Sequence, residues 1–267
     1  MPELPEVEAA RRVLEHALDR RIVAVDDTDE WVCRPHRPGE IASVLLGGTL
    51  TAAHRRGKSM WCDTRDVHGE EGPALGLHLG MGGRIVVTDA DGVRAGGDPR
   101  PDRAPRQAGW NRFTVRFDDG GELRLFDKRR LGRVRLDPDI DALGPDAEHI
   151  TAAQLRERLG RSHAPLKARL LDQKVLAGVG NLLADETLWQ ARLSPSRPSD
   201  ELDRSEVNRL HRSLRRALRA ATANGGVHTG RVIEHRHADG TCPRCGAPMV
   251  HGTVGGRSTW WCGKEQG

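Results

Sequence analysis

The N-terminal stretch MPELPE (residues 1–6) is the most informative part of the chain. If Met1 is removed, Pro2 presents a secondary amine, and the carboxylates of Glu3 and Glu6 follow it closely. An α-amino group titrates near neutrality, so much of it is an unprotonated nucleophile at working pH. Attack on a sugar carbon would give an iminium adduct, and a nearby carboxylate could move the protons. The simpler interpretation is an ordinary helix start, with proline in the first turn and acids at the positive helix end.

Composition limits the class of protein. The 267 residues can bury one large core or two modest ones. The sequence contains neither a long apolar run nor a charged-then-apolar leader, which predicts a cytoplasmic protein without an export signal. The formal net charge is +4, and arginine supplies most of the basic side chains. Arginine suits bidentate contacts with phosphate and guanine, so a polyanionic partner is favoured.

The first half of the chain predicts one helix followed by many strands. Apolar residues at Val7, Ala10, Leu14 and Leu18 have the spacing of one helix face over residues 6–19. Glycine-punctuated apolar stretches then predict eight short strands, and hence a β-sandwich or flattened barrel. These stretches are Ile22–Val25, Thr49–Ala53, Ser59–Asp63, Leu75–Leu79, Arg84–Thr88, Arg112–Phe117, Glu122–Phe126 and Arg133–Leu136. Residues 89–110 are predicted to form an exposed loop of low order.

The second half is predicted to be helical, which makes the whole chain an α+β protein. Helices are expected over Thr151–Leu159, Pro165–Leu171, Asn181–Ala191 and residues 202–223, the last ending at Gly225-Gly226. One face of the long helix is rich in arginine and either binds a polyanion or merely faces solvent. The turn-rich stretch Asp137–Asp146 is a plausible domain boundary.

Two further clusters carry chemistry. The segment LLDQKVLAGVGN (residues 170–181) predicts a glycine-bearing turn before a helix whose free N–H groups could meet an anion. Asn181 is expected at the N-cap, where its amide serves either the helix or a phosphate. Cys242, Cys245 and Cys262 gather at the C-terminus, in a pattern typical of metal binding in a reducing compartment.

These motifs together resemble a known family. The opening heptapeptide 2–8, Arg56-Gly57-Lys58, the segment 78–81 (HLGM), the run 172–181 and the cysteine hairpin occur in the same order as in bacterial formamidopyrimidine-DNA glycosylase and endonuclease VIII. The resemblance covers essentially the whole chain. It implies a β-sandwich domain flanked by helices (1–137), a linker (138–150), a helix–two-turn–helix domain (151–226), and a shortened loop with a zinc-finger-like hairpin (227–267). It also implies a monomeric base-excision-repair glycosylase and abasic-site lyase acting on damaged double-stranded DNA.

The resemblance also implies roles for acids and bases. Pro2 is similar to the nucleophile that attacks C1′ of the damaged nucleotide, and Glu3 to the acid/base that assists base loss. Glu6 and Glu186 resemble supporting acids near the proline. Lys58 matches a lysine that contacts phosphate beside the lesion.

Further matching positions concern the DNA backbone and the gap left by an extruded base. His78, Asn181 and Arg257 match phosphate contacts, and Met81 matches a gap filler. The family's other gap fillers lie in an Arg-x-Phe motif, where this chain has Arg129 and Leu131. A leucine can wedge into a base stack but cannot stack as a ring does, so the opposite-base preference is open.

Substrate choice also stays open. The family loop that caps an oxidised purine is reduced here to Val227–Thr241. This favours oxidised pyrimidines, ring-opened purines or abasic sites over 8-oxoguanine, which is the alternative within the same class. An alternative from another class is a protein that binds distorted DNA without chemistry.

The finger departs from the family pattern at its last ligand. Glu265 stands where the fourth cysteine is expected. Tetrahedral zinc needs four donors, and a carboxylate is an acceptable one. Three alternatives follow: one structural zinc held by Cys242, Cys245, Cys262 and Glu265; a three-cysteine site completed by a histidine or water; or a metal-free hairpin. We expect the first.

Overall fold

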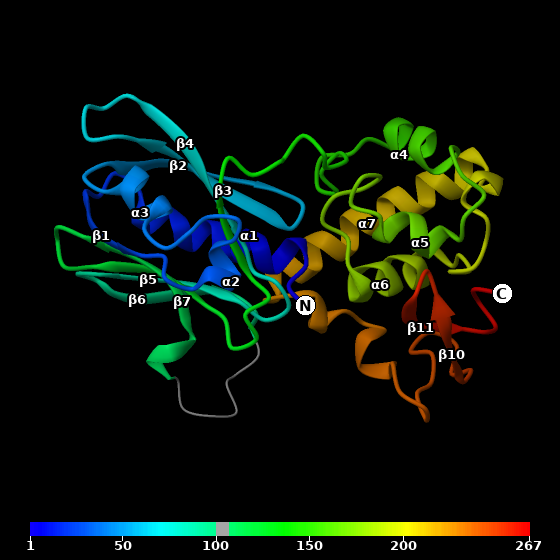
Figure 1. Cartoon of the computed structure of the whole chain (residues 1–267). Coiled ribbons are helices and arrows are strands. Elements are labelled where there is room, and N and C mark those ends of the chain that lie inside the picture. The colour runs from blue at the N-terminus through cyan, green and yellow to red at the C-terminus, as the bar shows by residue number, and fades with distance from the viewer. Residues whose placement is uncertain (100–106) are drawn as a thin grey trace. The chain divides into compact units, whose positions relative to one another are not determined.

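The computed structural model describes residues 1–99 and 107–267, and the chain divides into two compact units (Figure 1). The first unit comprises Met1–Pro2 and Glu6–Ile140, and the second comprises Glu3–Pro5 and Asp141–Gly267. The short segment Glu3–Pro5 therefore belongs to the second unit, although residues of the first unit flank it on both sides in the sequence. Part of the loop predicted over 89–110 lies outside the described residues.

The first unit contains two antiparallel sheets, which confirms the β-sandwich class. One sheet has the strand order β1-β7-β8-β5-β6 and the other β2-β3-β4-β9. The strands are β1 (Ile22–Asp26), β2 (Thr49–Arg56), β3 (Ser59–Arg65), β4 (Glu71–His78), β5 (Arg84–Asp89), β6 (Gly92–Gly97), β7 (Asn111–Phe117), β8 (Glu122–Phe126) and β9 (Arg133–Leu136). Their inward side chains form one core with Val7, Ala10 and Leu14 of helix α1 (Leu4–Leu14).

Two predictions for this unit were wrong in detail. The helix predicted over 6–19 is α-helical only to Leu14, and a 3-10 turn (Glu15–Ala17) follows it. Strand β6 pairs with β5 inside the segment predicted as a loop. The glycines of this strand weaken its signal in the sequence. Glycine is nevertheless required at position 96, because a β-carbon there would lie 2.4 Å from the carbonyl oxygen of Ala9. Two short helices, α2 (Glu30–Cys33) and α3 (Glu40–Leu45), were also not predicted.

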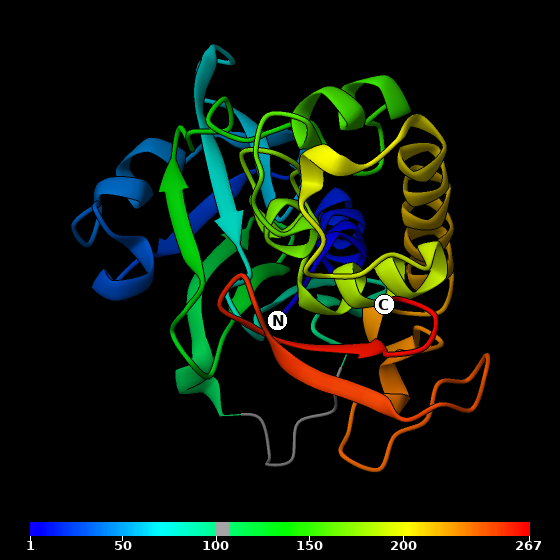
Figure 2. The ribbon, with the colours of Figure 1, turned by 90° about the vertical axis from the view of Figure 1, so that its right-hand side faces the viewer.

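The second unit is helical and ends in a β-hairpin (Figure 2). Its helices are α4 (Ala152–Leu159), α5 (Leu166–Leu171), α6 (Asn181–Ala191) and α7 (Arg204–Ala223), close to the predicted ranges. Thr151 and Gln154 form the capping box that begins α4. The hairpin joins β10 (Met249–Val254) to β11 (Arg257–Cys262), and its inner side chains pack with Trp189 of α6. Within the described ranges, every helix is too short or too polar to cross a bilayer.

Candidate active site

The carboxylate of Glu3 occupies the N-terminus of α6. Its Oε2 accepts hydrogen bonds from the backbone N–H groups of Gly180 (2.9 Å) and Leu183 (3.1 Å), and its Oε1 accepts one from Leu182 (2.9 Å). Glu3 is only 2% exposed. Since the first N–H groups of a helix lack partners within the helix, an acidic side chain is stabilised there. The carboxylate next to Pro2 in sequence is thus held in one position.

The glycines in the turn before α6 leave the space that this carboxylate fills. A β-carbon at residue 180 would lie 2.3 Å from the carboxyl carbon of Glu3, and Gly178 has φ +108°. The side chain of Gln173 braces the turn, because it accepts from the N–H of Gly178 (2.9 Å) and donates to the carbonyl of Val179 (3.0 Å). The pattern Asp-Gln-Lys followed by Gly-Val-Gly therefore forms a turn that accommodates the carboxylate of Glu3.

Asn181 does not cap α6, and that prediction was wrong. The N-cap residue is Gly180, and Asn181 is the first helical residue. The capping role belongs to Glu3, which is distant in sequence and so could not be recognised from the local pattern. The Nδ2 of Asn181 instead donates to the carbonyl of Ser258 on β11 (3.0 Å).

The other N-terminal residues differ in exposure. Met1 is 44% exposed, whereas Pro2 is buried. Glu6 lies on α1 and is also buried.

Lys58 and His78 lie at the same end of the four-stranded sheet. Lys58 follows Gly57 (φ +61°) in the β2–β3 turn, and His78 pairs in register with Ser59. The Nδ1 of His78 accepts from the N–H of Gly80 (3.0 Å). Burial, and then the positive charges of Lys58, Arg133 and Arg135, lower the pKa of His78 to about 4. His78 is consequently neutral at pH 7, with its proton on Nε2 as a donor.

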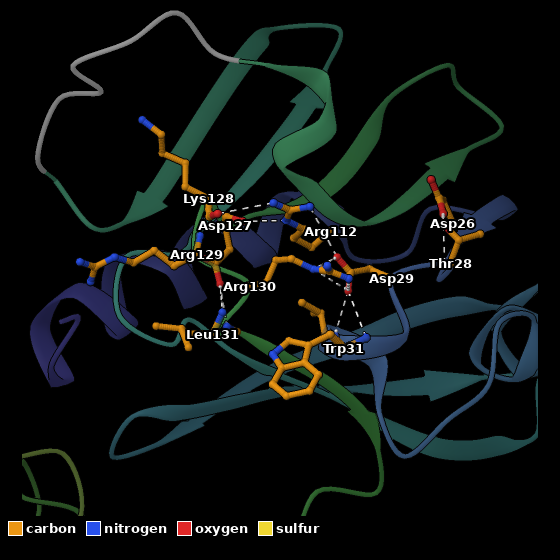
Figure 3. Close-up of polar contacts among 12 residues, drawn as sticks. Asp26, Thr28, Asp29, Trp31, Arg112, Asp127, Lys128, Arg129, Arg130 and Leu131 are labelled. Carbon is orange, nitrogen blue, oxygen red and sulfur yellow. Dashed lines mark hydrogen bonds and ion pairs between the residues drawn. The ribbon is translucent and has the colours of Figure 1, made fainter.

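A second surface loop carries Arg129 and Leu131 (Figure 3). The buried carboxylate of Asp127 shapes it by accepting from three backbone N–H groups, those of Arg129 (2.9 Å), Leu131 (2.7 Å) and Gly132 (2.6 Å). Leu131 is left 40% exposed. Met81, in the turn between β4 and β5, is similarly exposed. The turn and the loop meet, since a β-carbon at Gly80 would lie 2.4 Å from the carbonyl carbon of Leu131.

Glu186, on α6, organises the short segment after α7. Its Oε2 accepts from the N–H of Val232 (2.9 Å), and its Oε1 accepts from the side chain of Gln190 (2.8 Å). Gly230 lies against it, because a β-carbon there would come within 2.9 Å of Oε2. Glu186 is therefore engaged with the loop 227–241 in this structure.

The sequence pattern did not single out a buried ion pair between α5 and α6. The Nζ of Lys167 lies 2.6 Å from Asp185 Oδ1, and both side chains are fully buried. Arg236 also donates to Asp185 (2.9 Å), and Lys167 donates to Thr259 Oγ1 (2.8 Å) on β11. Burial lowers the pKa of Lys167 and raises that of Asp185. The sequence offered one signal for this pair: Lys167 and Asp185 each lie on a helix face whose other residues are mostly apolar.

This network fixes the hairpin that presents Arg257. Gly255 (φ +59°) and Gly256 (φ +70°) form the tight turn, and Arg257 is the first residue of β11, with its side chain exposed. A β-carbon at Gly255 would lie 2.8 Å from the methyl group of Ala168 on α5. Arg257 thus follows a tight turn that packs against α5.

The three C-terminal cysteines form a group that could hold a metal ion. Their Sγ atoms all lie within 4.8 Å of one another, and those of Cys245 and Cys262 are 3.5 Å apart. The indole N–H of Trp189 donates to Cys242 Sγ (3.3 Å). Despite burial, which opposes it, this bond and backbone donors lower the pKa of Cys242 to about 7. Clustered thiols of this kind suit a soft divalent ion such as zinc.

Glu265 lies apart from this group. Its carboxylate forms an ion pair with Arg244 and lies 3.7 Å from Arg192. The guanidinium of Arg244 also covers the ring of Trp189 at 4.2 Å. Among the residues that the structure describes, the metal-capable group here contains only the three thiols. Glu265 as the fourth ligand stays a prediction, which requires its carboxylate to leave Arg244.

Comparison with known proteins assigns both units. Residues 1–134 match the model of the formamidopyrimidine-DNA glycosylase N-terminal domain, and residues 142–231 match the model of its H2TH domain. A formamidopyrimidine-DNA glycosylase of Roseiflexus sp. is 34% identical over 98% of this chain and 98% of its own. One of Parafrankia sp. is 37% identical over 87% of this chain and 81% of its own.

Solved structures agree with these matches. A complex of Lactococcus lactis Fpg with abasic-site DNA is 28% identical and covers 99% of both chains, with a TM-score of 0.78. A complex of the G226P mutant of that enzyme with Fapy-dG DNA gives a TM-score of 0.80 at 28% identity and the same coverage.

Proposed function

Because this chain belongs to the formamidopyrimidine-DNA glycosylase family, we propose that it is a bifunctional enzyme that excises damaged bases and then cleaves the abasic site. The solved relatives were bound to abasic-site or Fapy-dG DNA, which supports damaged double-stranded DNA as the substrate. The observation that carries the proposal is the fixed position of Glu3, immediately after Pro2.

The chemistry follows from these two residues. After removal of Met1, the nitrogen of Pro2 attacks C1′ of the damaged nucleotide, and the bond from C1′ to the base breaks. The proline nitrogen loses its proton as it bonds to C1′; the Glu3 carboxylate accepts that proton as a general base and returns it as a general acid to the ring oxygen of the sugar when the bond from C1′ to that oxygen breaks. The ring-opened adduct is an iminium (Schiff base), which acidifies the C2′ proton and so permits elimination of the 3′ phosphate. Glu6 and Glu186 support this centre.

Holding the nucleotide outside the helix needs cations and wedges. Lys58, the Nε2–H of neutral His78, Asn181 and Arg257 are the proposed phosphate contacts, and each is on a turn or a helix or strand end. Extruding a base costs a few kcal/mol, so several such contacts must act together. Met81, Arg129 and Leu131 fill the vacated stack.

For substrate choice, the short segment 227–241 supports oxidised pyrimidines, ring-opened purines and abasic sites. The names of the relatives favour the alternative, an enzyme directed at 8-oxoguanine and formamidopyrimidine. Ring-opened purines belong to both alternatives. A panel of lesion duplexes, each with four opposite bases, separates them by single-turnover rates.

We also propose one structural zinc ion, held by Cys242, Cys245, Cys262 and Glu265. Zinc would supply folding free energy to a hairpin too small to be stable alone, and takes no part in the reaction.

Borohydride trapping tests the proposed function. The Met1-processed enzyme, incubated with abasic-site DNA and borohydride, should form a stable covalent adduct whose peptide mass maps to residue 2. Pro2→Gly should lose most of it, and a matched protein with one residue added before Pro2 should lose it entirely. An adduct that survives in both variants and maps to a lysine would overturn the role of Pro2. Tight binding with no adduct would support the non-catalytic alternative.

A further inference from the structure

The loop 127–132 is tied to helix α2, and this tie places an unassigned aromatic side chain beside it (Figure 3). Asp29 caps α2 by accepting from the N–H groups of Trp31 (3.2 Å) and Val32 (3.1 Å). The same carboxylate accepts from Arg130 at 2.8 and 3.0 Å. Burial opposes ionisation of Asp29, but the bonds to Arg130 lower its pKa, so its carboxylate is ionised at neutral pH. The backbone of Arg130, at φ +54°, is held in a conformation that non-glycine residues rarely adopt.

Trp31 lies on α2, and its side chain is only partly covered by neighbouring residues. It is 52% exposed, and it is the one exposed residue among the six tryptophans, all of which lie in the described ranges. The guanidinium carbon of Arg34 lies 3.7 Å from the ring centroid, and that of Arg133 lies 5.8 Å away. An aromatic ring flanked by guanidinium groups is the arrangement that proteins use to stack a nucleobase or sugar next to a phosphate.

The arginines around Trp31 form a local positive field. Arg133 pairs through β9 with His78 on β4, and Arg135 donates to the carbonyl of Arg34 (3.3 Å). Burial, followed by the charges of Arg34 and Arg135, lowers the pKa of Arg133, and the negative charge of Asp127 opposes this only in part. Within residues 1–99 and 107–267, no carboxylate forms an ion pair with Arg34, Arg133 or Arg135. The nearby carboxylate of Asp29 pairs with Arg130 and Arg112 instead. Such mutual repulsion is relieved by a bound anion.

We propose that Trp31, Arg34 and Arg133 form a contact site for the DNA strand that passes the Leu131 loop: a base or sugar of that strand stacks on Trp31, while its phosphate lies against Arg34 and Arg133. The site rests on the proposed function, because it needs DNA seated on Arg129 and Leu131. It extends that function by assigning a DNA contact to α2, a helix that carries none of the proposed catalytic residues. The leucine at position 131 cannot stack as a ring does, and Trp31 supplies the aromatic surface nearby.

Binding to a noncleavable duplex tests the site without requiring any chemistry. The probe is a duplex with a tetrahydrofuran abasic analogue, measured by fluorescence anisotropy across several salt concentrations. Trp31→Ala should raise Kd about tenfold, within the range of lost base stacking, and Trp31→Phe should recover most of the affinity. Arg34→Gln should lower the slope of log K against log salt by about one unit. Leu46→Ala, an equally exposed apolar residue on the same unit, and Arg65→Gln, at the β3–β4 end, are matched controls expected to bind like wild type.

The outcomes separate this site from the proposed chemistry. If Trp31→Ala binds as tightly as wild type, or if its melting temperature falls in step with its affinity, the site is refuted while borohydride trapping still stands. Loss of trapping in the wild type, with binding that depends on Trp31, would refute the chemistry and leave the site. If Trp31 proves necessary for capturing a protein and not the duplex, the DNA assignment is refuted.

Discussion

The carboxyl carbon of Glu3 lies 2.3 Å from the point that a β-carbon at residue 180 would occupy, and the N–H of Gly180 donates to that carboxylate at 2.9 Å. Residues 177 positions apart in sequence therefore share one small volume. The site therefore needs a residue without a side chain at position 180 as well as the carboxylate of Glu3.

Gly180→Ala should consequently displace Glu3 without removing any chemical group. A shift of about 1 Å in a catalytic acid can cost on the order of a hundredfold in rate, so we expect a single-turnover excision rate lower by roughly that factor. Gly109→Ala is the matched control, because a β-carbon there meets no atom of the described residues within 4 Å. Equal excision rates for the two variants would refute the steric role of Gly180.

The local patterns of this chain predicted its elements well, for physical reasons that specific residues show. Thr151 with Gln154 is a capping signal readable within four residues, and α4 begins there. The Gly225-Gly226 pair ends α7 with positive φ at both residues. Strand β6 was missed because close packing against α1 requires glycine at position 96, and glycines weaken any strand signal.

Long-range partnerships were not readable from the sequence. Asn181 looked like an N-cap because that type is preferred there, yet Glu3 takes the role from the other end of the chain. Lys167 and Asp185 likewise pair across two helices, and only the fold brings them together. The resemblance named most candidate side chains, but not the groups that hold them.

The ion pair between Arg244 and Glu265 should compete with zinc for the carboxylate. Arg244→Ala should therefore tighten zinc binding, Glu265→Ala should weaken it about tenfold, and Cys245→Ser should abolish it. Competition with a colorimetric chelator gives the affinities, and elemental analysis gives the stoichiometry. Unchanged affinity in Glu265→Ala would remove Glu265 from the ligand set, and a metal content near zero in the wild type would establish a metal-free hairpin.

His78 should make the first unit sensitive to acid. Its folded pKa, about 4, lies below the unfolded value near 6.5, so protonation favours the unfolded chain. The stabilisation is complete above pH 6.5 and is lost as the pH falls towards 4. Between pH 7 and 4.5, wild type should lose about 2 kcal/mol more unfolding free energy than His78→Gln. Urea titrations at both pH values measure this, with His68→Gln, at an exposed turn, as the control; parallel losses in wild type and His78→Gln would contradict it.

Lys167 and Asp185 provide the sharpest test of what holds the hairpin. Lys167→Met removes the cation from a fully buried carboxylate, and breaking such a pair typically costs about 3 to 5 kcal/mol. Asp185 keeps Arg236 as a partner, so we expect the lower end of that range, measured by guanidinium denaturation. Adding Asp185→Asn to Lys167→Met should recover part of the loss, because a neutral amide needs no buried counter-charge and still accepts from Arg236, although Arg236 then loses its ion pair. Lys174→Met, on an exposed side chain, should stay within about 0.5 kcal/mol of wild type. If the double variant is less stable than Lys167→Met alone, the loss comes from packing, and the buried charge is not its cause.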